Sequence, residues 1–214
     1  MSTDGTRGRP PSSRWSVLRA LLLEPGPVTQ RALSERLEIT QQSVSRILPT
    51  LAEVVARSSG GWQLADRDRA LTLWLQSYRG PGGHSTWWYG LDAPNVQSEQ
   101  AATLASTLGV APLISGDTAA DRYAPWRTPR TARLYVREPI DLSSAGFVPD
   151  LTPSATLELV VPKDRSLWGT SVILDSRRYS DPLMVLWELV HRSDATDAPE
   201  AAEHLVNTLP GLVG

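Results

Sequence analysis

The chain contains no cysteine, and this absence removes several kinds of chemistry. Without thiols there are no disulfides, no cysteine-ligated zinc and no cysteine nucleophile. No apolar run reaches the roughly 18 residues of a membrane-spanning helix, so we expect no membrane span. The first residues also lack the charged-then-apolar order of a secretory signal peptide. Together these absences favour a cytoplasmic protein.

Common enzyme motifs are missing as well. There is no Gly-x-Ser-x-Gly elbow, no Walker loop and no Gly-x-Gly-x-x-Gly turn. Asp117 and Asp121 are spaced like paired carboxylates, but a helix dipole also explains an aspartate at a helix start. A metal site would need the acids and histidines near the C-terminus, and one histidine on a helix face is more often solvated: His191, Asp194, Glu200, Glu203, His204. We therefore expect no enzymatic activity, no metal and no cofactor.

Lysine is nearly absent, so the basic charge of the chain is almost entirely guanidinium. Residues 1–80 hold 11 arginines against 7 acidic residues, a net charge of +4. Residues 81–214 hold 9 arginines and 1 lysine against 16 acidic residues, a net charge of −6. The basic N-terminal part suits a polyanion, whereas the acidic remainder should face a different partner.

Residues 28–51 have the pattern of a helix–turn–helix. Leu33 and Leu37 give a first short helix an apolar stripe, and Thr40 is suited to cap a second helix. The second helix carries apolar residues at helical spacing: Val44, Ile47, Leu48, Leu51. Pro49 should loosen this helix at its end, because proline removes a backbone donor.

The other face of this second helix carries hydrogen-bonding side chains near its N-terminal end. A recognition helix offers such side chains to base edges in a major groove. We therefore predict DNA contacts from the cap and the outer face: Thr40, Gln41, Gln42, Ser43, Ser45, Arg46. The alternative reading is an ordinary helical hairpin with a solvated polar face.

The flanking sequence favours DNA binding. A helix with Trp15, Leu18 and Leu22 comes before, and residues 54–64 read as a β-hairpin, the wing of a winged helix. Trp62 should anchor this wing, and Arg57 is placed to touch phosphate. Further upstream, residues 7–10 resemble the core of an AT-hook, in which two arginines enter a narrow minor groove: Arg7, Arg9.

Residues 66–214 read as one mixed α/β unit. We expect a buried strand at 85–89 and further strands at 133–137, 156–161 and 171–174. Helices should begin after Asp66, Ser115 and Asp181, and Asp197 with Glu200 resembles a capping box. The sequence thus predicts an α+β protein with a basic arm at 1–13, a winged helix–turn–helix at 14–65 and the mixed α/β part at 66–214.

Several short motifs occur in the order and spacing of a known family. They are residues 115–121, Arg127-Thr128-Pro129, residues 134–136, residues 161–164, residues 179–183 and residues 201–205. From about residue 28 to 209 the chain resembles antitoxins of the AbiEi family. The resemblance implies an N-terminal domain that represses its own operon and a C-terminal domain that neutralises a nucleotidyltransferase-like toxin. The Arg-Gly-Arg-Pro arm is not a feature of that family.

Our interpretation is an autoregulating antitoxin whose partners are the double-stranded DNA of its own promoter and a nucleotidyltransferase-like toxin. One alternative is a free-standing repressor with an effector pocket built around Trp87, Trp88 and Trp126. A second alternative is a nucleotidyltransferase that uses Asp117 and Asp121. The oligomeric state stays open.

Overall fold

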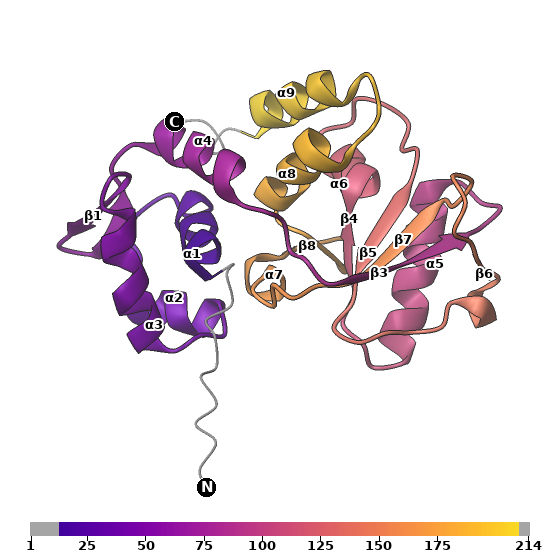
Figure 1. Ribbon diagram of the computed structural model, residues 1–214, viewed down its shortest axis with the longest axis horizontal. Helices are drawn as coiled ribbons and strands as arrows, with labels where there is room; N and C mark the ends of the chain where they lie inside the picture. Colours follow the sequence, from indigo (N-terminus) through magenta and orange to yellow (C-terminus); the bar gives the residue numbers. More distant parts are fainter. Residues whose placement is uncertain (1–12, 210–214) are drawn as a thin grey trace, which may run out of the picture.

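The computed structural model describes residues 13–209. The fold is α+β, with an N-terminal winged helix–turn–helix followed by a mixed α/β part around a seven-stranded sheet (Figure 1). The predicted arm with Arg7 and Arg9 lies outside the described residues. Buried apolar side chains form one continuous core that runs through both parts.

Three helices and a two-stranded wing make up the N-terminal part. The helices are α1 (Ser13–Leu22), α2 (Gln30–Arg36) and α3 (Gln41–Ile47), and the wing strands are β1 (Val55–Ser58) and β2 (Gly61–Leu64). Val28 forms an antiparallel bridge with Trp62, which also packs against the core, so the predicted anchoring of the wing is confirmed. Gly61 is required here, since a Cβ would lie 2.4 Å from the Val28 carbonyl oxygen.

Local sequence signals explain the helix–turn–helix. The side chains of Thr29 and Thr40 cap α2 and α3 by accepting from the backbone N–H three residues later. Glu38 takes a positive φ of 53° in the turn between the helices. At Pro49 the α-helix gives way to the 3₁₀-helix η1 (Leu48–Leu51), which confirms the predicted loosening.

The helix α4 (Arg67–Ser77) begins at its predicted cap, Asp66, and lies against α1. The indole N–H of Trp74 donates to the carbonyl of Trp15 at 3.1 Å, and Trp74 is fully buried. α4 therefore packs on the winged helix, although the sequence-based division places it with the C-terminal part. The division at residue 65 stays a prediction.

The C-terminal sheet has the strand order β6-β3-β7-β5-β4-β9-β8. The strands are β3 (His84–Tyr89), β4 (Leu113–Ser115), β5 (Ala132–Tyr135), β6 (Val148–Pro149), β7 (Leu157–Val161), β8 (Val172–Leu174) and β9 (Arg177–Tyr179). The pairs β5–β7 and β4–β9 are parallel, and all other pairs are antiparallel.

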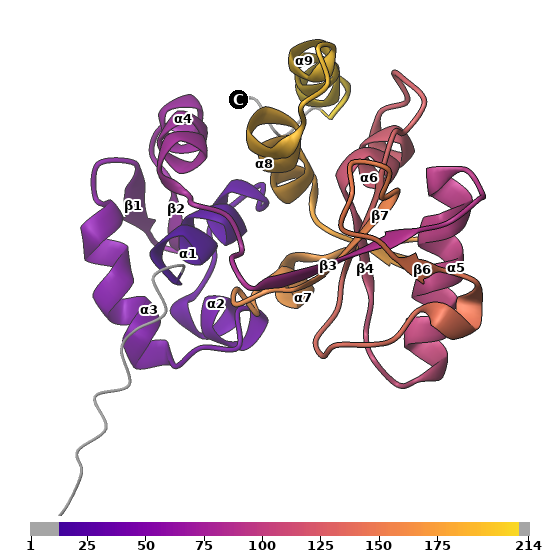
Figure 2. The same cartoon turned by 45° about the vertical axis from the view of Figure 1, so that its right-hand side comes forward.

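Helices cover both faces of this sheet. α5 (Pro94–Thr107) lies on one face, and α6 (Gly116–Tyr123) and α8 (Pro182–Arg192) lie on the other, with α9 (Ala198–Thr208) outside α8 (Figures 1 and 2). The short helices η2 (Ser143–Ala145) and α7 (Leu167–Thr170) lie in connections. Gly109 follows the end of α5 at a φ of 74°, a left-handed conformation that glycine adopts without strain.

Two expectations for this part need correction, and short strands were missed. The strand at 84–89 is not buried as a whole, because it lies near the sheet edge and only Trp88 is fully covered. The capping box at Asp197 does not form, since its carboxylate binds Arg127 instead. The short strands β4 and β9 were not predicted, because three residues carry too little periodicity to show.

A buried ionic cluster joins the two parts of the molecule. Arg19 on α1 is fully buried, with Nη1 3.7 Å from Asp164 and Nε 3.4 Å from Asp181. Its Nη2 donates to Ser166 Oγ at 3.0 Å, and the Tyr78 hydroxyl donates to Asp164 at 2.8 Å. Burial alone would lower the pKa of Arg19, but Asp181 and Asp164 outweigh it and raise that pKa above its ordinary value, so the side chain stays charged.

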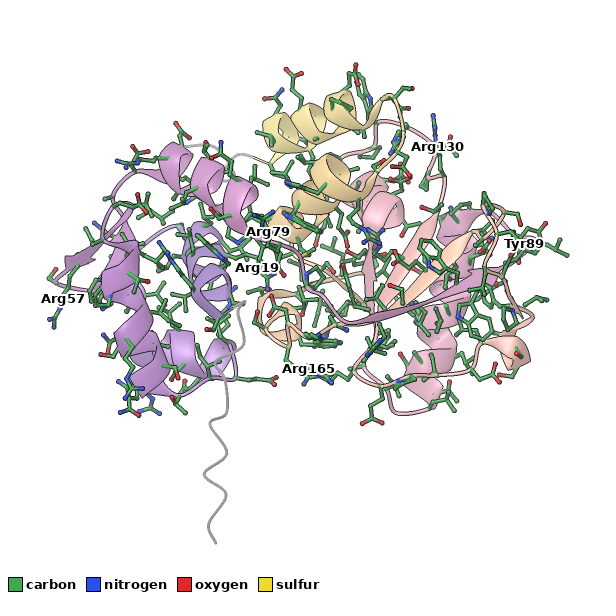
Figure 3. The ribbon with its side chains drawn as sticks, in the orientation of Figure 1. Arg19, Arg57, Arg79, Tyr89, Arg130 and Arg165 are labelled. Carbon is green, nitrogen blue, oxygen red and sulfur yellow. The ribbon has the colours of Figure 1, made fainter. Side chains whose placement is uncertain are left out.

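The helix–turn–helix itself also touches the C-terminal part. Arg36 Nε at the end of α2 donates to the carbonyl of Gly169 at 3.0 Å. Glu38, in the turn between α2 and α3, pairs with Arg137 at 2.7 Å. Figure 3 shows Arg19 at the centre of the molecule and Arg165 below it, both where the two parts meet.

Candidate nucleic-acid interface

The orientation of α3 is set by its apolar residues. Val44 and Ile47 are buried against α1 and α2, with exposed fractions of 0% and 1%. This places Gln41, Gln42 and Arg46 on the solvent side, where all three are exposed, together with Ser45. α3 thus exposes two amides in its first turn and a guanidinium in its last turn, on the side that the sequence predicts.

Thr40 and Ser43 already have partners within the helix cap. Thr40 Oγ1 accepts from the Ser43 N–H at 3.1 Å and lies 2.9 Å from the Ser43 hydroxyl. Their structural task is therefore to start the helix, and their contact with DNA stays a prediction. Ser45 lies on the exposed side without such a partner among the described hydrogen bonds.

Arg57 lies on the wing, opposite Trp62 in the β1–β2 register. Its side chain extends from the tip of the N-terminal part, farthest from the sheet (Figure 3). Within residues 13–209, neither Arg46 nor Arg57 forms an ion pair, whereas Arg14 and Arg36 each pair with a glutamate. These two guanidinium groups are thus available for an external anion.

The C-terminal part leaves this surface open. In both views α3 and the wing lie on the side of the N-terminal part that faces away from the sheet (Figures 1 and 2). Arg31, which was not among the predicted contacts, lies on α2 with 80% of its side chain exposed and pairs with Glu35. The first helix of a helix–turn–helix crosses the DNA backbone, so the position of Arg31 on that helix could have indicated a phosphate contact.

The other sequence candidates are dispersed. Trp87 lines a cavity in the C-terminal part, Trp88 is buried, and Trp126 contacts His204 in a tilted arrangement with ring centroids 4.9 Å apart. The three tryptophans therefore do not share a pocket. Neighbouring residues of a strand point to opposite faces, which separates the first two.

The acidic candidates have structural partners as well. Asp117 accepts from Arg127 Nη2 at 2.9 Å and from the Arg130 N–H at 3.1 Å, while Asp121 lines a different cavity. His191 stacks on Trp187. Across residues 13–209, no group of three histidine or acidic side chains could hold a metal ion. Within the same range no helix is long and apolar enough to cross a membrane.

A helix–turn–helix with a capped, polar recognition helix and a bridged β-hairpin defines a winged-helix DNA-binding domain. Residues 8–53 match the MarR family, which covers the predicted arm in part, the three helices and η1. No match was found among curated proteins, nor among solved structures. The chain therefore carries the winged-helix DNA-binding domain of a transcription regulator.

Proposed function

We propose that this protein is an autorepressor and antitoxin: the winged helix binds its own promoter, and the C-terminal part neutralises a nucleotidyltransferase-like toxin. The observation that carries the DNA half is a pair of exposed guanidinium groups, Arg46 on α3 and Arg57 on the wing, that form no ion pair with any of residues 13–209. The exposed amides of Gln41 and Gln42 on the same helix also suit a DNA groove.

The chemistry divides among these residues by position. A glutamine pairs in bidentate fashion with adenine and an arginine with guanine, so Gln41, Gln42 and Arg46 are the proposed base readers. Arg57 on the wing is the proposed phosphate contact, together with Thr40, Ser43 and Ser45 at the start of α3. Arg7 and Arg9 would enter the adjacent minor groove, most favourably where A·T pairs narrow it.

The antitoxin half rests on the resemblance to the AbiEi family and on charge. Residues 81–214 carry a net charge of −6, which suits a partner with a basic face. A nucleotidyltransferase that handles RNA is expected to have such a face, and opposite potentials speed the encounter of two proteins.

A footprint on the chain's own promoter tests the DNA half. We expect protection of a short sequence by the full-length protein, loss of protection for Arg46→Ala, and protection as in the wild type for Arg178→Ala. Arg178 is the matched control because it is an exposed arginine on β9, in the C-terminal sheet and outside the winged helix. Protection that survives both Arg46→Ala and Arg57→Ala would refute the proposed interface.

The two halves are separated by one growth experiment with full-length protein. Cells express the nucleotidyltransferase-like protein encoded nearest the gene, with either the wild type or the double variant Arg46→Ala, Arg57→Ala. We expect both to restore growth, while only the wild type represses a promoter reporter. Growth that fails even with the wild type would refute the antitoxin half, and growth restored only with DNA binding would refute the division of labour.

A further inference from the structure

A row of polar side chains crosses the C-terminal sheet. Ser115 of β4 pairs with Arg133 of β5, Arg133 with Glu158 of β7, and Glu158 with Trp87 of β3. Residues paired in this way lie on the same face of a sheet. This face is covered by α8, and a sheet face beneath a helix is ordinarily apolar. Burial of an ionic group costs free energy, so buried charges on this face call for an explanation.

Two buried carboxylates beside this row, those of Glu158 and Glu188, are already filled by donors. Glu188 of α8 accepts from the Ser115 hydroxyl and the Gly116 N–H, both at 2.7 Å, and from the Tyr135 hydroxyl. Glu158 accepts from the hydroxyl of Ser85 and from two arginines. Burial raises the pKa of Glu158, but Arg133, Ser85 and Arg192 outweigh it and hold that pKa below its ordinary value. Neither carboxylate has spare capacity for a cationic ligand.

The guanidinium groups, in contrast, keep donors in reserve. Arg133 uses Nε on Glu158 at 2.7 Å and has Nη1 3.3 Å from Glu188, and Arg192 uses one Nη2 on Glu158 at 3.0 Å. A guanidinium has five N–H donors. Arg130 contacts a carboxylate only at 3.6 Å and has 58% of its side chain exposed. Three arginines thus face the same space with donors to spare.

That space is a cavity of about 550 Å³ beside the polar row. It is lined by Trp87, the arginines 130, 133 and 192, and apolar residues that include Leu151 and Leu189. The volume is that of a small-molecule site, for which roughly 300–1,000 Å³ is typical. Asp194 is the one lining carboxylate that is exposed, since Asp117 is bound by Arg127 and Glu188 is buried. In Figure 3, Arg130 lies beside the turn between α8 and α9, on the side of the sheet away from the winged helix.

We propose that this cavity binds a small organic anion, whose carboxylate or phosphate group is held by Arg130, Arg133 and Arg192 while a planar apolar group lies against Trp87. An arginine fork matches the oxygens of either anion, and an indole face offers apolar area to a flat ring. The ligand site lies in the C-terminal part and shares no residue with the DNA-binding face on α3 and the wing.

Calorimetric titration of the full-length protein tests the site with four probes. Benzoate and adenosine 5′-monophosphate represent the carboxylate and phosphate sources, benzamide is the neutral counterpart of benzoate, and inorganic phosphate lacks the ring. We expect one of the two ring-bearing anions to bind with a Kd below about 1 mM, and benzamide and inorganic phosphate to bind at least about tenfold more weakly.

Variants then place the binding in the cavity. Arg130→Gln should raise the Kd of the anion that binds by about tenfold or more. The melting temperature should not change, because the Arg130 side chain is largely exposed. Trp87→Leu should weaken binding of the ring-bearing anion and leave the affinity for inorganic phosphate unchanged. Arg178→Gln, at an exposed arginine outside the cavity, is the matched control. The proposal is overturned if no probe binds below about 1 mM, if phosphate binds as well as the ring-bearing anions, or if Arg178→Gln has the effect of Arg130→Gln.

Discussion

Arginines serve opposite purposes in the two parts of this molecule. Arg46 and Arg57 extend into solvent from α3 and the wing, and within residues 13–209 neither has an ion-pair partner. In the C-terminal part, Arg127 is only 12% exposed and contacts two carboxylates, those of Asp117 and Asp197. The number of arginines in a region therefore says little about anion binding. What matters is whether the fold has already neutralised each guanidinium.

The junction between the two parts follows the second pattern. Arg19 belongs to the basic N-terminal part, yet it is buried between two aspartates of the acidic C-terminal part. The two parts thus differ in net charge and are also joined by a specific ionic contact between opposite charges. Changes at the junction should affect folding, and changes on the open face should affect DNA binding alone.

The largest effect is expected from Arg19→Met. Two aspartates would then stay buried without their cation, and breaking a buried pair in this way costs about 3–5 kcal/mol of unfolding free energy. Denaturant unfolding measures this loss. The control is Arg31→Met, whose 80% exposed guanidinium pairs with Glu35 on the surface and should contribute at most about 1 kcal/mol. Equal losses for the two variants would contradict the junction described here.

Gly169→Ala should also act through the junction, with a smaller loss. A Cβ at this position would lie 1.6 Å from the Arg36 carbonyl oxygen, so α2 must shift relative to α7. Overpacking of this kind typically costs about 1–3 kcal/mol. Gly26→Ala is the matched control, because nothing lies within 4 Å of the added carbon. A melting temperature unchanged in Gly169→Ala would show that the two parts do not hold this contact.

On the open face, Arg46→Ala and Arg57→Ala should differ in kind. Arg46→Ala should weaken binding by about 1–3 kcal/mol and relax the preference at one base pair. Arg57→Ala should weaken binding evenly across sequences and lower the salt slope of log K by about 1. Binding titrations on mutated operator sites at several salt concentrations measure both, and melting curves should match the wild type. If both variants lost affinity equally on all DNA sequences, the face would make only phosphate contacts and Arg46 would not read a base.

The smallest effect is expected from Glu38→Gln, which removes the surface pair between the helix–turn–helix and the sheet. The hydrogen bond from Arg137 is the main cause that lowers the pKa of Glu38 below its ordinary 4.5. A lowered carboxyl pKa stabilises the fold above the ordinary value, and this stabilisation is lost as pH falls through the folded pKa. We expect a loss of about 0.2–1 kcal/mol at neutral pH that vanishes in acid, measured by unfolding at both. A loss that persists in acid would mean that the charge is not its cause.

Where sequence reasoning succeeded, the cause is local. Thr40 caps α3 through an N–H three residues away, and Pro49 ends its own α-helix. The helical spacing of Val44 and Ile47 decides which side of α3 is buried. These interactions need no knowledge of the rest of the fold. The predicted base readers on α3 are exposed for the same reason, although their contacts with DNA stay predictions.

Where sequence reasoning failed, the side chain interacts with a residue that is distant in the sequence. Asp197 has the spacing of a capping box but binds Arg127, seventy residues earlier in the chain. The three tryptophans of the effector pocket considered as an alternative lie apart, because strand alternation and the position of α9 separate them. A pattern along the chain cannot show which distant partner competes for a group.

The sequence by itself determined the winged helix–turn–helix, the polar face of α3 and the mixed α/β class of the remainder, because caps, breakers and periodicity act over a few residues. Only the tertiary structure decided that Arg19 joins the two parts, since its aspartates lie 145 and more positions away. The same holds for Ser115, Arg133, Glu158 and Trp87, which become a row through strand register alone. Register depends on non-local pairing, and no local signal in these short strands specifies it.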